Sequence, residues 1–198
     1  MKKLLAASLL SVAATGAFAQ ANAFEGFSAG VKVSSVGGST ALSSPGFSGN
    51  WGQQSVVPTI EAGYTYGVSK EIALGLTATY DLANTKLGSE DNANIKGKNH
   101  YSLNFKPGYV FNNTTMLYAI LGYNSMTGSL NVNGASASTT FNGFGAGVGL
   151  QTLLSKNIYV QVEAQQLTYS GVTKSIGGEN VTFTPSATVG TLGLGYKF

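Results

Sequence analysis

The segment Leu192-Gly-Leu-Gly-Tyr-Lys-Phe198, with which the chain ends, decides the class of fold. Its alternate positions, Leu192, Leu194, Tyr196 and Phe198, are apolar or aromatic, and Gly or Lys stands between them. Because alternate side chains of a strand point to opposite faces, this pattern predicts a strand with one apolar, aromatic-ended face. Such a face would make an exposed edge of a soluble protein prone to aggregation, whereas it suits the lipid-facing wall of a membrane barrel. We therefore expect the segment to be a strand of a transmembrane β-barrel.

The same alternation recurs along the chain and marks eight expected strands. Their outward, mostly apolar faces begin at Phe27, Pro58, Ile72, Tyr101, Leu117, Phe144, Ile158 and Ala187. In the fifth segment both faces are apolar, and we assign Leu117, Ala119, Leu121 and Tyr123 to the outside. Alternation of period two without helical spacing predicts an all-β fold, an eight-stranded antiparallel transmembrane β-barrel.

Short and long connections alternate strictly between these segments. Short turns are expected at 67–71, 111–115 and 153–157, and long links rich in Gly, Ser, Asn and Thr near 35–57, 83–99, 125–140 and 168–185. Short periplasmic turns and long extracellular loops are typical of transmembrane barrels, and they place both termini on the periplasmic side. Trp51 and the charged residues of 86–98 are then expected in long loops.

The first nineteen residues are typical of a cleaved secretory signal. Two lysines are followed by an apolar run too short to span a membrane and by the small residues of Ala17-Phe-Ala19. We expect cleavage before Gln20, with a second possible site before Phe24, so that residues 1–19 are the signal and residues 20–198 form one barrel domain.

The composition excludes several classes of function. All eleven basic residues are lysines and two of them belong to the signal, so neither charge nor arginine contacts favour a nucleic-acid partner. With no cysteine and one histidine, the chain lacks the usual ligands of a metal site, and we expect no metal and no cofactor. No apolar run after the signal reaches 18 residues, which excludes a transmembrane helix.

The inner face of the expected barrel is small and polar, and it carries charges of both signs. These are Lys32, Glu61, Asp81, Lys106 and Glu163. An eight-stranded barrel has room for little more than its own side chains, and buried charges need partners. We therefore expect these residues to form one polar network that plugs the lumen.

Two further motifs invite a sharper interpretation. His100-Tyr-Ser102 is similar to the His-x-Ser pair of outer-membrane lipid A deacylases, and Asp81 is expected nearby if the third and fourth strands pair. All three side chains are expected to face the lumen, where a lipid cannot reach them, so we favour a structural cluster and assign no catalytic residue. The alternate glycines of Gly143–Gly149 lack the Lys-Ser/Thr of a phosphate loop and predict an inner face that accommodates bulky neighbours.

Taken together, the signal, the alternating segments, the loop order and the Gly-Tyr-Lys-Phe ending resemble the OmpA/OmpX-like, opacity-protein type of small outer-membrane barrel. The resemblance implies a protein of the bacterial outer membrane, exported through the periplasm, with Leu192, Leu194, Tyr196 and Phe198 as the C-terminal assembly signal. It also implies the partners: outer-membrane lipid and lipopolysaccharide, the barrel-assembly machinery during biogenesis, and an unknown extracellular ligand.

The function expected from this resemblance is a structural or surface-interaction role, in envelope integrity or adhesion, for a monomer that is not an enzyme. The alternatives are a narrow porin for ions or small solutes and, more weakly supported, an outer-membrane lipid-modifying enzyme.

Overall fold

The computed structural model describes residues 21–44, 47–90, 93–132, 135–176 and 179–198. The expected signal segment lies outside the described residues, as do its cleavage residues Ala17, Ala19 and Gln20. No helix among the described residues is long and apolar enough to cross a membrane.

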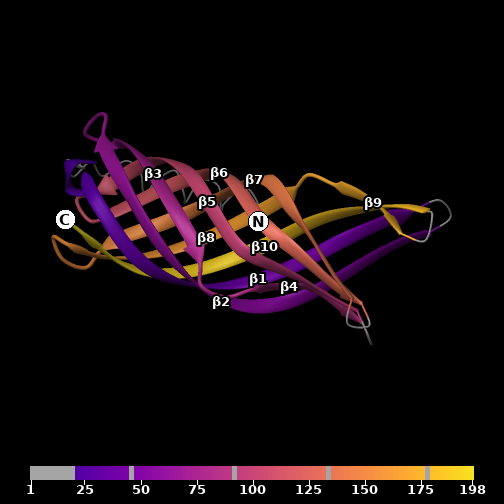
Figure 1. Ribbon diagram of the computed structural model, residues 1–198. Coiled ribbons are helices and arrows are strands. Elements are labelled where there is room, and N and C mark those ends of the chain that lie inside the picture. Colours follow the sequence, from indigo (N-terminus) through magenta and orange to yellow (C-terminus); the bar gives the residue numbers. More distant parts are fainter. Residues whose placement is uncertain (1–20, 45–46, 91–92, 133–134, 177–178) are drawn as a thin grey trace, which may run out of the picture.

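The described chain is almost entirely β-strand. After a short 3-10 helix, Ala21–Ala23, its strands are β1 Gly26–Ser44, β2 Phe47–Gly67, β3 Ile72–Asp81, β4 Thr85–Glu90, β5 Ala93–Asn112, β6 Thr115–Val132, β7 Ala135–Leu153, β8 Ile158–Tyr169, β9 Val172–Ile176 and β10 Glu179–Lys197. Eight of them form a ring in the order β1-β2-β3-β5-β6-β7-β8-β10, which the pairing of β10 with β1 closes (Figure 1). Every pair is antiparallel, so the expected eight-stranded antiparallel barrel is confirmed.

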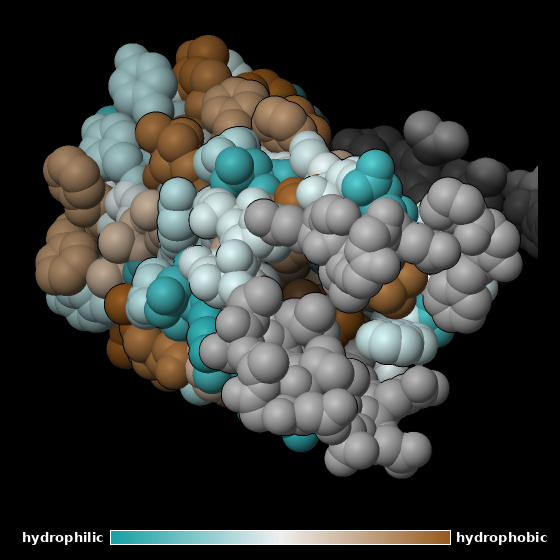
Figure 2. All heavy atoms as spheres, turned by 45° about the vertical axis from the view of Figure 1, so that its right-hand side comes forward, coloured by the Kyte–Doolittle hydropathy of each residue, from teal (hydrophilic) through white to brown (hydrophobic). Residues whose placement is uncertain are grey.

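The alternation of the sequence becomes the two faces of the barrel wall. In β6, which was the ambiguous fifth segment, Leu117 and Leu121 are 44% and 55% exposed, whereas Tyr118 and Ile120 are buried inside. The outward phase assigned to this strand is therefore confirmed. In Figure 2, brown apolar side chains gather on the wall of the barrel, and white and teal residues lie over the end that carries the long hairpins.

The last strand closes the ring in the register that its alternation implies. Leu194 lies opposite Val31 and Tyr196 opposite Ala29, and Tyr196 packs edge-on against Phe198 with ring centroids 5.1 Å apart. The backbone N–H of Phe198 donates to the carbonyl of Phe27 at 2.9 Å. The apolar face of the tail thus joins the outer wall at the end of the short turns.

The long links were expected as loops, and this expectation is wrong for most of their length. β1 and β2 continue as a paired hairpin to Ser44 and from Phe47, and β4 resumes the line of β3 after a short break. The hairpins extend beyond the barrel as two arms, one with the ends of β1, β2, β9 and β10, the other with β4, β5, β6 and β7 (Figure 1). Backbone pairing holds these strands together, and the apolar-out pattern of a lipid-facing wall is not needed for it.

Trp51 is one residue whose observed position therefore differs from the loop expected from the sequence. It lies on β2 opposite Thr40 of β1, and its partly buried ring packs against a cluster of apolar side chains inside the barrel. Residues 86–98, also expected in a loop, belong largely to β4 and β5.

Candidate functional site

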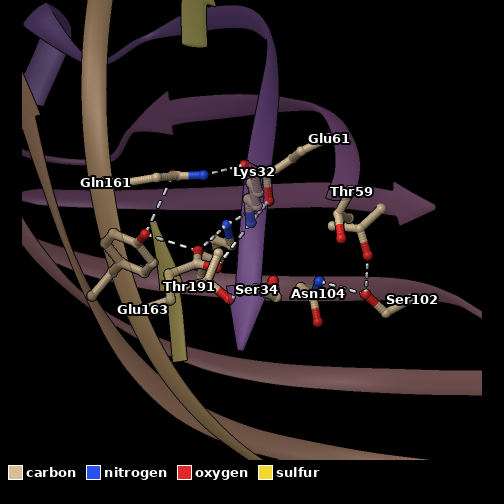
Figure 3. Close-up of polar contacts among 12 residues, drawn as sticks. Lys32, Ser34, Thr59, Glu61, Ser102, Asn104, Gln161, Glu163 and Thr191 are labelled. Atoms are coloured by element: carbon tan, nitrogen blue, oxygen red, sulfur yellow. Dashed lines mark hydrogen bonds and ion pairs between the residues drawn. The ribbon is translucent and has the colours of Figure 1, made fainter. Parts of the chain in front are cut away.

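Four charged side chains from four strands meet in the middle of the lumen. Lys32 on β1 contacts Glu61 on β2 at 2.5 Å and Glu163 on β8 at 2.8 Å. Lys106 on β5 contacts the same two carboxylates, each at 2.8 Å. All four residues are buried, and each ammonium group bridges both carboxylates, so two positive and two negative charges form one neutral group. Figure 3 shows Lys32 between Glu61 and Glu163.

Two uncharged side chains donate further hydrogen bonds to the carboxylates of this group. The amide of Gln161 donates to Glu61 Oε1 at 2.8 Å, and the hydroxyl of Tyr118 donates to Glu163 Oε1 at 2.9 Å. The Lys106 ammonium also lies 5.2 Å from the centre of the Tyr118 ring, within the range of a cation–π contact. Gln161 and Tyr118 were not assigned to the site from the sequence, although the alternation of side chains along β8 and β6 places both on the inner face. We call these six residues the charge network.

Asp81 does not belong to the charge network, and its expected place there is wrong. Its carboxylate accepts a hydrogen bond from Thr59 at 2.6 Å and pairs with His100 Nδ1 at 2.8 Å. The register explains the separation, because Glu61 lies opposite Thr79 whereas Asp81 lies opposite Thr59, two residues nearer the long hairpins. The alternation of side chains along a strand places a residue on the inner face but does not give its height in the lumen.

An apolar cluster closes the lumen below the charge network, at the end of the short turns. It consists of Ala21, Phe24, Ala73, Val110, Met116, Tyr118, Ile120, Leu153 and Tyr159. The segment before β1 enters this end of the barrel, since the N–H of Ala21 donates to the carbonyl of Lys70 at 2.9 Å and Phe24 is 2% exposed. The only sequence signal of this contribution is an apolar residue just before the first alternating segment.

A second apolar cluster closes the lumen at the end of the long hairpins. Its buried members are Val36, Val57, Leu87, Ile95, Met126, Phe141, Leu167, Tyr169, Ala187 and Val189. Between this cluster and the charge network lies a cavity of about 60 Å³, with Lys32, Glu163, Asp81, His100 and Tyr169 among its walls. A cavity of this size holds only a few water molecules.

The His100-Tyr-Ser102 motif lies beside this cavity, on the inner face. The hydroxyl of Ser102 hydrogen-bonds to Thr79 at 2.6 Å and accepts from the amide of Asn104 at 2.8 Å. His100 is bonded to Asp81, and its Nε2 is buried without a hydrogen-bond partner among the described residues. The serine is thus engaged by Thr79 and Asn104, while the carboxylate and the histidine form a separate pair.

Glycines on the inner face leave room for the large side chains of the lumen. A Cβ atom at Gly149 would collide with the ring of Tyr118, and one at Gly195 would collide with the ring of Tyr159. Gly149 of β7 and Gly195 of β10 therefore allow these tyrosines to fill the interior, and Gly145 likewise leaves room for the side chain of Leu167.

Comparison with known proteins agrees with this architecture. A family model described as "Outer membrane protein beta-barrel domain" matches residues 4–198. Among solved structures, the chain is similar to Ail, the attachment invasion locus protein of Yersinia pestis, with 19% identity and a TM-score of 0.48 over 88% of this chain and 99% of that one. It is also similar to the outer membrane protein OprG from Pseudomonas aeruginosa, with 15% identity and a TM-score of 0.45 over 87% and 98%. A third similar structure is the outer membrane protease OmpT from Escherichia coli, with 12% identity and a TM-score of 0.45 over 88% and 97%. No curated protein matches the sequence.

Proposed function

Because the chain belongs to the family of outer membrane protein β-barrel domains, and so lies in the bacterial outer membrane, we propose that it acts through its outer hairpins. In this proposal it has a structural or surface-interaction role, and it is neither an open channel nor an enzyme. One observation carries the proposal: the lumen is filled by the charge network, with an apolar cluster on either side.

The filled lumen argues against the porin alternative. A steady pore needs a continuous water path, but the cavity beside the charge network measures about 60 Å³ and apolar side chains lie both above and below it. Opening a path requires the separation of buried ion pairs, and leaving a fully buried charge without its partner costs roughly 3–5 kcal/mol. A resting wild-type barrel should therefore stay closed to ions.

The length of the hairpins supports a role outside the membrane. A transmembrane β-strand needs only about 9–11 residues. β1 has 19 residues, β2 has 21 and β5 has 20, so close to half of each strand extends past the bilayer. The hairpin arms of Figure 1 then present a rigid, paired surface to the medium, with the short turns in the periplasm.

The inner-face position of Asp81, His100 and Ser102 supports a structural role for this cluster. A lipid-modifying enzyme must meet its substrate on the outer wall, whereas these side chains line or border the lumen cavity. In addition, the bonds of Ser102 run to Thr79 and Asn104, so the serine lacks a histidine positioned as its base.

Conductance of the purified protein in a planar lipid bilayer tests the closed lumen. We expect at most rare, brief openings for the wild type and more frequent openings for Glu61→Gln, in which Lys32 has lost one of its two carboxylates. Steady conductance of the wild type, unchanged in this variant, would establish a pore and overturn the proposal.

The orientation can be tested separately, because the chain has no cysteine and single-cysteine variants are therefore unambiguous. Gln53→Cys lies exposed on an outer hairpin and Lys156→Cys in a short turn. On intact cells, a maleimide that cannot cross the outer membrane should label the first and reach the second only after the membrane is breached. The reverse pattern would invert the topology.

A further inference from the structure

The chain enters the lumen at the end of the short turns before it begins the wall. Ala21–Ala23 form one 3-10 turn, and the N–H of Phe24 donates to the carbonyl of Ala21 at 2.9 Å. Ala21 is 0% exposed and Phe24 is 2% exposed, although both precede the first strand of the ring. In Figure 1 this indigo segment lies at the end of the barrel that carries the short turns, beside the C-terminus. We call residues 21–24 the N-terminal plug.

Gly26 is the residue at which the chain turns from the lumen into the wall. Its φ of 126° lies in the region that favours glycine, and a Cβ atom there would be 3.1 Å from the carbonyl oxygen of Phe198. Any larger residue would have a strained backbone and would be crowded by the last residue of the chain. The entry of the N-terminal plug is therefore built into the sequence where β1 starts.

Hydrogen bonds fix both ends of the N-terminal plug to the barrel. The N–H of Ala21 donates to the carbonyl of Lys70, in the turn between β2 and β3, at 2.9 Å. Directly after the plug, the carboxylate of Glu25 accepts a hydrogen bond from the N–H of Gly67 at 3.2 Å. The carbonyl of Glu25 accepts a further bond from the ammonium group of Lys197 at 3.1 Å. The plug is thus held by a short turn on one side and by the last strand on the other.

The N-terminal plug packs into the apolar cluster below the charge network. Besides Ala21 and Phe24, the cluster contains inward side chains of β3, β5, β6, β7 and β8, namely Ala73, Val110, Met116, Tyr118, Ile120, Leu153 and Tyr159. Because these strands lie on different sides of the ring, the cluster extends across the lumen. Removal of the plug would take away the two members that belong to no strand. It would expose the remaining members to water at the end of the short turns.

The position of the N-terminal plug bears on where the expected signal is removed. Cleavage before Gln20 keeps the whole plug in the mature chain, with the new α-ammonium group one residue before Ala21. Cleavage before Phe24, the second possible site, would remove Ala21–Ala23 and leave the α-ammonium group on Phe24 itself. An unpaired charge is strongly disfavoured among apolar side chains, and Phe24 is buried in such a cluster. The structure therefore fits a cut before Gln20 and not one before Phe24.

We infer that the N-terminal plug seals the lumen at the end of the short turns, and that signal cleavage before Gln20 preserves this seal in the mature protein. The inference rests on the closed lumen of the proposed function, and it adds a barrier that is separate from the charge network. It concerns access from the periplasmic side alone, because the second apolar cluster lies at the opposite end of the lumen.

The seal is tested with Val110→Cys, a substitution of similar size at a residue that is 0% exposed in the same cluster. In the purified protein in neutral detergent, a small water-soluble maleimide should label this cysteine very slowly. Adding Phe24→Ala should raise the labelling rate on the order of a hundredfold, because truncation of a buried phenylalanine weakens its packing by a factor of this size. Phe24→Leu, a smaller truncation, should give a smaller increase, and it carries the test if the alanine variant does not fold.

Matched controls separate loss of the seal from a general loosening of the barrel. Phe27→Ala removes the same side chain three residues later, from the outer wall where Phe27 is 67% exposed, and should leave the rate at Val110→Cys unchanged. Met126→Cys, in the apolar cluster at the other end, should stay slow with and without Phe24→Ala. The heat-modifiable band shows that each variant is folded. An unchanged rate at Val110→Cys, or equal acceleration at both cysteines, overturns the inference.

Signal removal has its own readout, the intact mass of the protein extracted from outer membranes. We expect a chain that begins at Gln20, as glutamine or its cyclised form. A chain that begins at Phe24 would lack Ala21–Ala23 and would overturn the inference whatever the labelling rates. Failure of the proposed function is distinguishable, because it shows as steady conductance of the wild type. Rapid labelling of Val110→Cys in a protein that does not conduct would contradict the seal alone.

Discussion

Replacement of Glu61 by Gln should destabilise the barrel strongly. The contacts of Glu61 allow the loss in free energy of unfolding to be worked out. Glu61 accepts hydrogen bonds from Lys32, Lys106 and Gln161. The glutamine has nearly the same volume, so the change removes one negative charge and leaves two buried lysines with Glu163 alone. Loss of one partner of a fully buried pair costs roughly 3–5 kcal/mol. The adjoining cavity admits a little water, so we expect a loss of about 3 kcal/mol, more than a hundredfold in the folding equilibrium.

The assay is reversible urea unfolding of the protein from lipid vesicles, with the heat-modifiable band on unheated gels as a second readout. Adding Lys32→Met to Glu61→Gln restores neutrality, so the double variant should recover at least half of the lost stability. Lys156→Gln, a charge removal at an exposed turn, should change stability by less than about 0.5 kcal/mol. If the double variant is as unstable as the sum of its two single changes, the ion pairs are not the reason for the loss.

The remaining predictions concern packing and assembly. Gly149→Leu should prevent formation of the folded, heat-modifiable barrel, because the new side chain occupies the place of the Tyr118 ring. Gly190→Ala, whose added Cβ has nothing within 4 Å, should fold normally. Equal yields of the two variants in the membrane fraction would contradict this account of the lumen. The double variant Tyr196→Ser/Phe198→Ser should be degraded or aggregated in the periplasm, as judged by cell fractionation. Normal membrane insertion of this variant would show that the tail is not the assembly signal.

The alternation of outward and inward side chains made the fold, and most of the residues that fill the lumen, predictable. Once alternate residues are known to face lipid, the side chains between them must point inward, and this placed Lys32, Glu61, Lys106 and Glu163 in one narrow space. This alternation predicts only the face of the barrel wall on which a side chain lies, however. The height of Asp81 depends on the register between β2 and β3, which backbone pairing and the short turn at 67–71 set, and no side-chain pattern reports it.

The hairpins were missed for a related reason. The strands were recognised by an apolar outward face, and this face is lost in the hairpins, whose apolar side chains, such as Leu87, Ile95 and Met126, instead point inward into a buried cluster. The plug formed by Phe24 was missed because a single apolar residue has no period. In both cases the structure depends on backbone bonds or on one tertiary contact, and neither has a repeating signature.

The charges in the middle of the lumen are paired within the chain itself. Each ammonium group of the charge network contacts two carboxylates, and each carboxylate contacts both ammonium groups. Since opening a water path through the lumen would separate these buried pairs, they support the proposal that the barrel stays closed and acts through its outer hairpins.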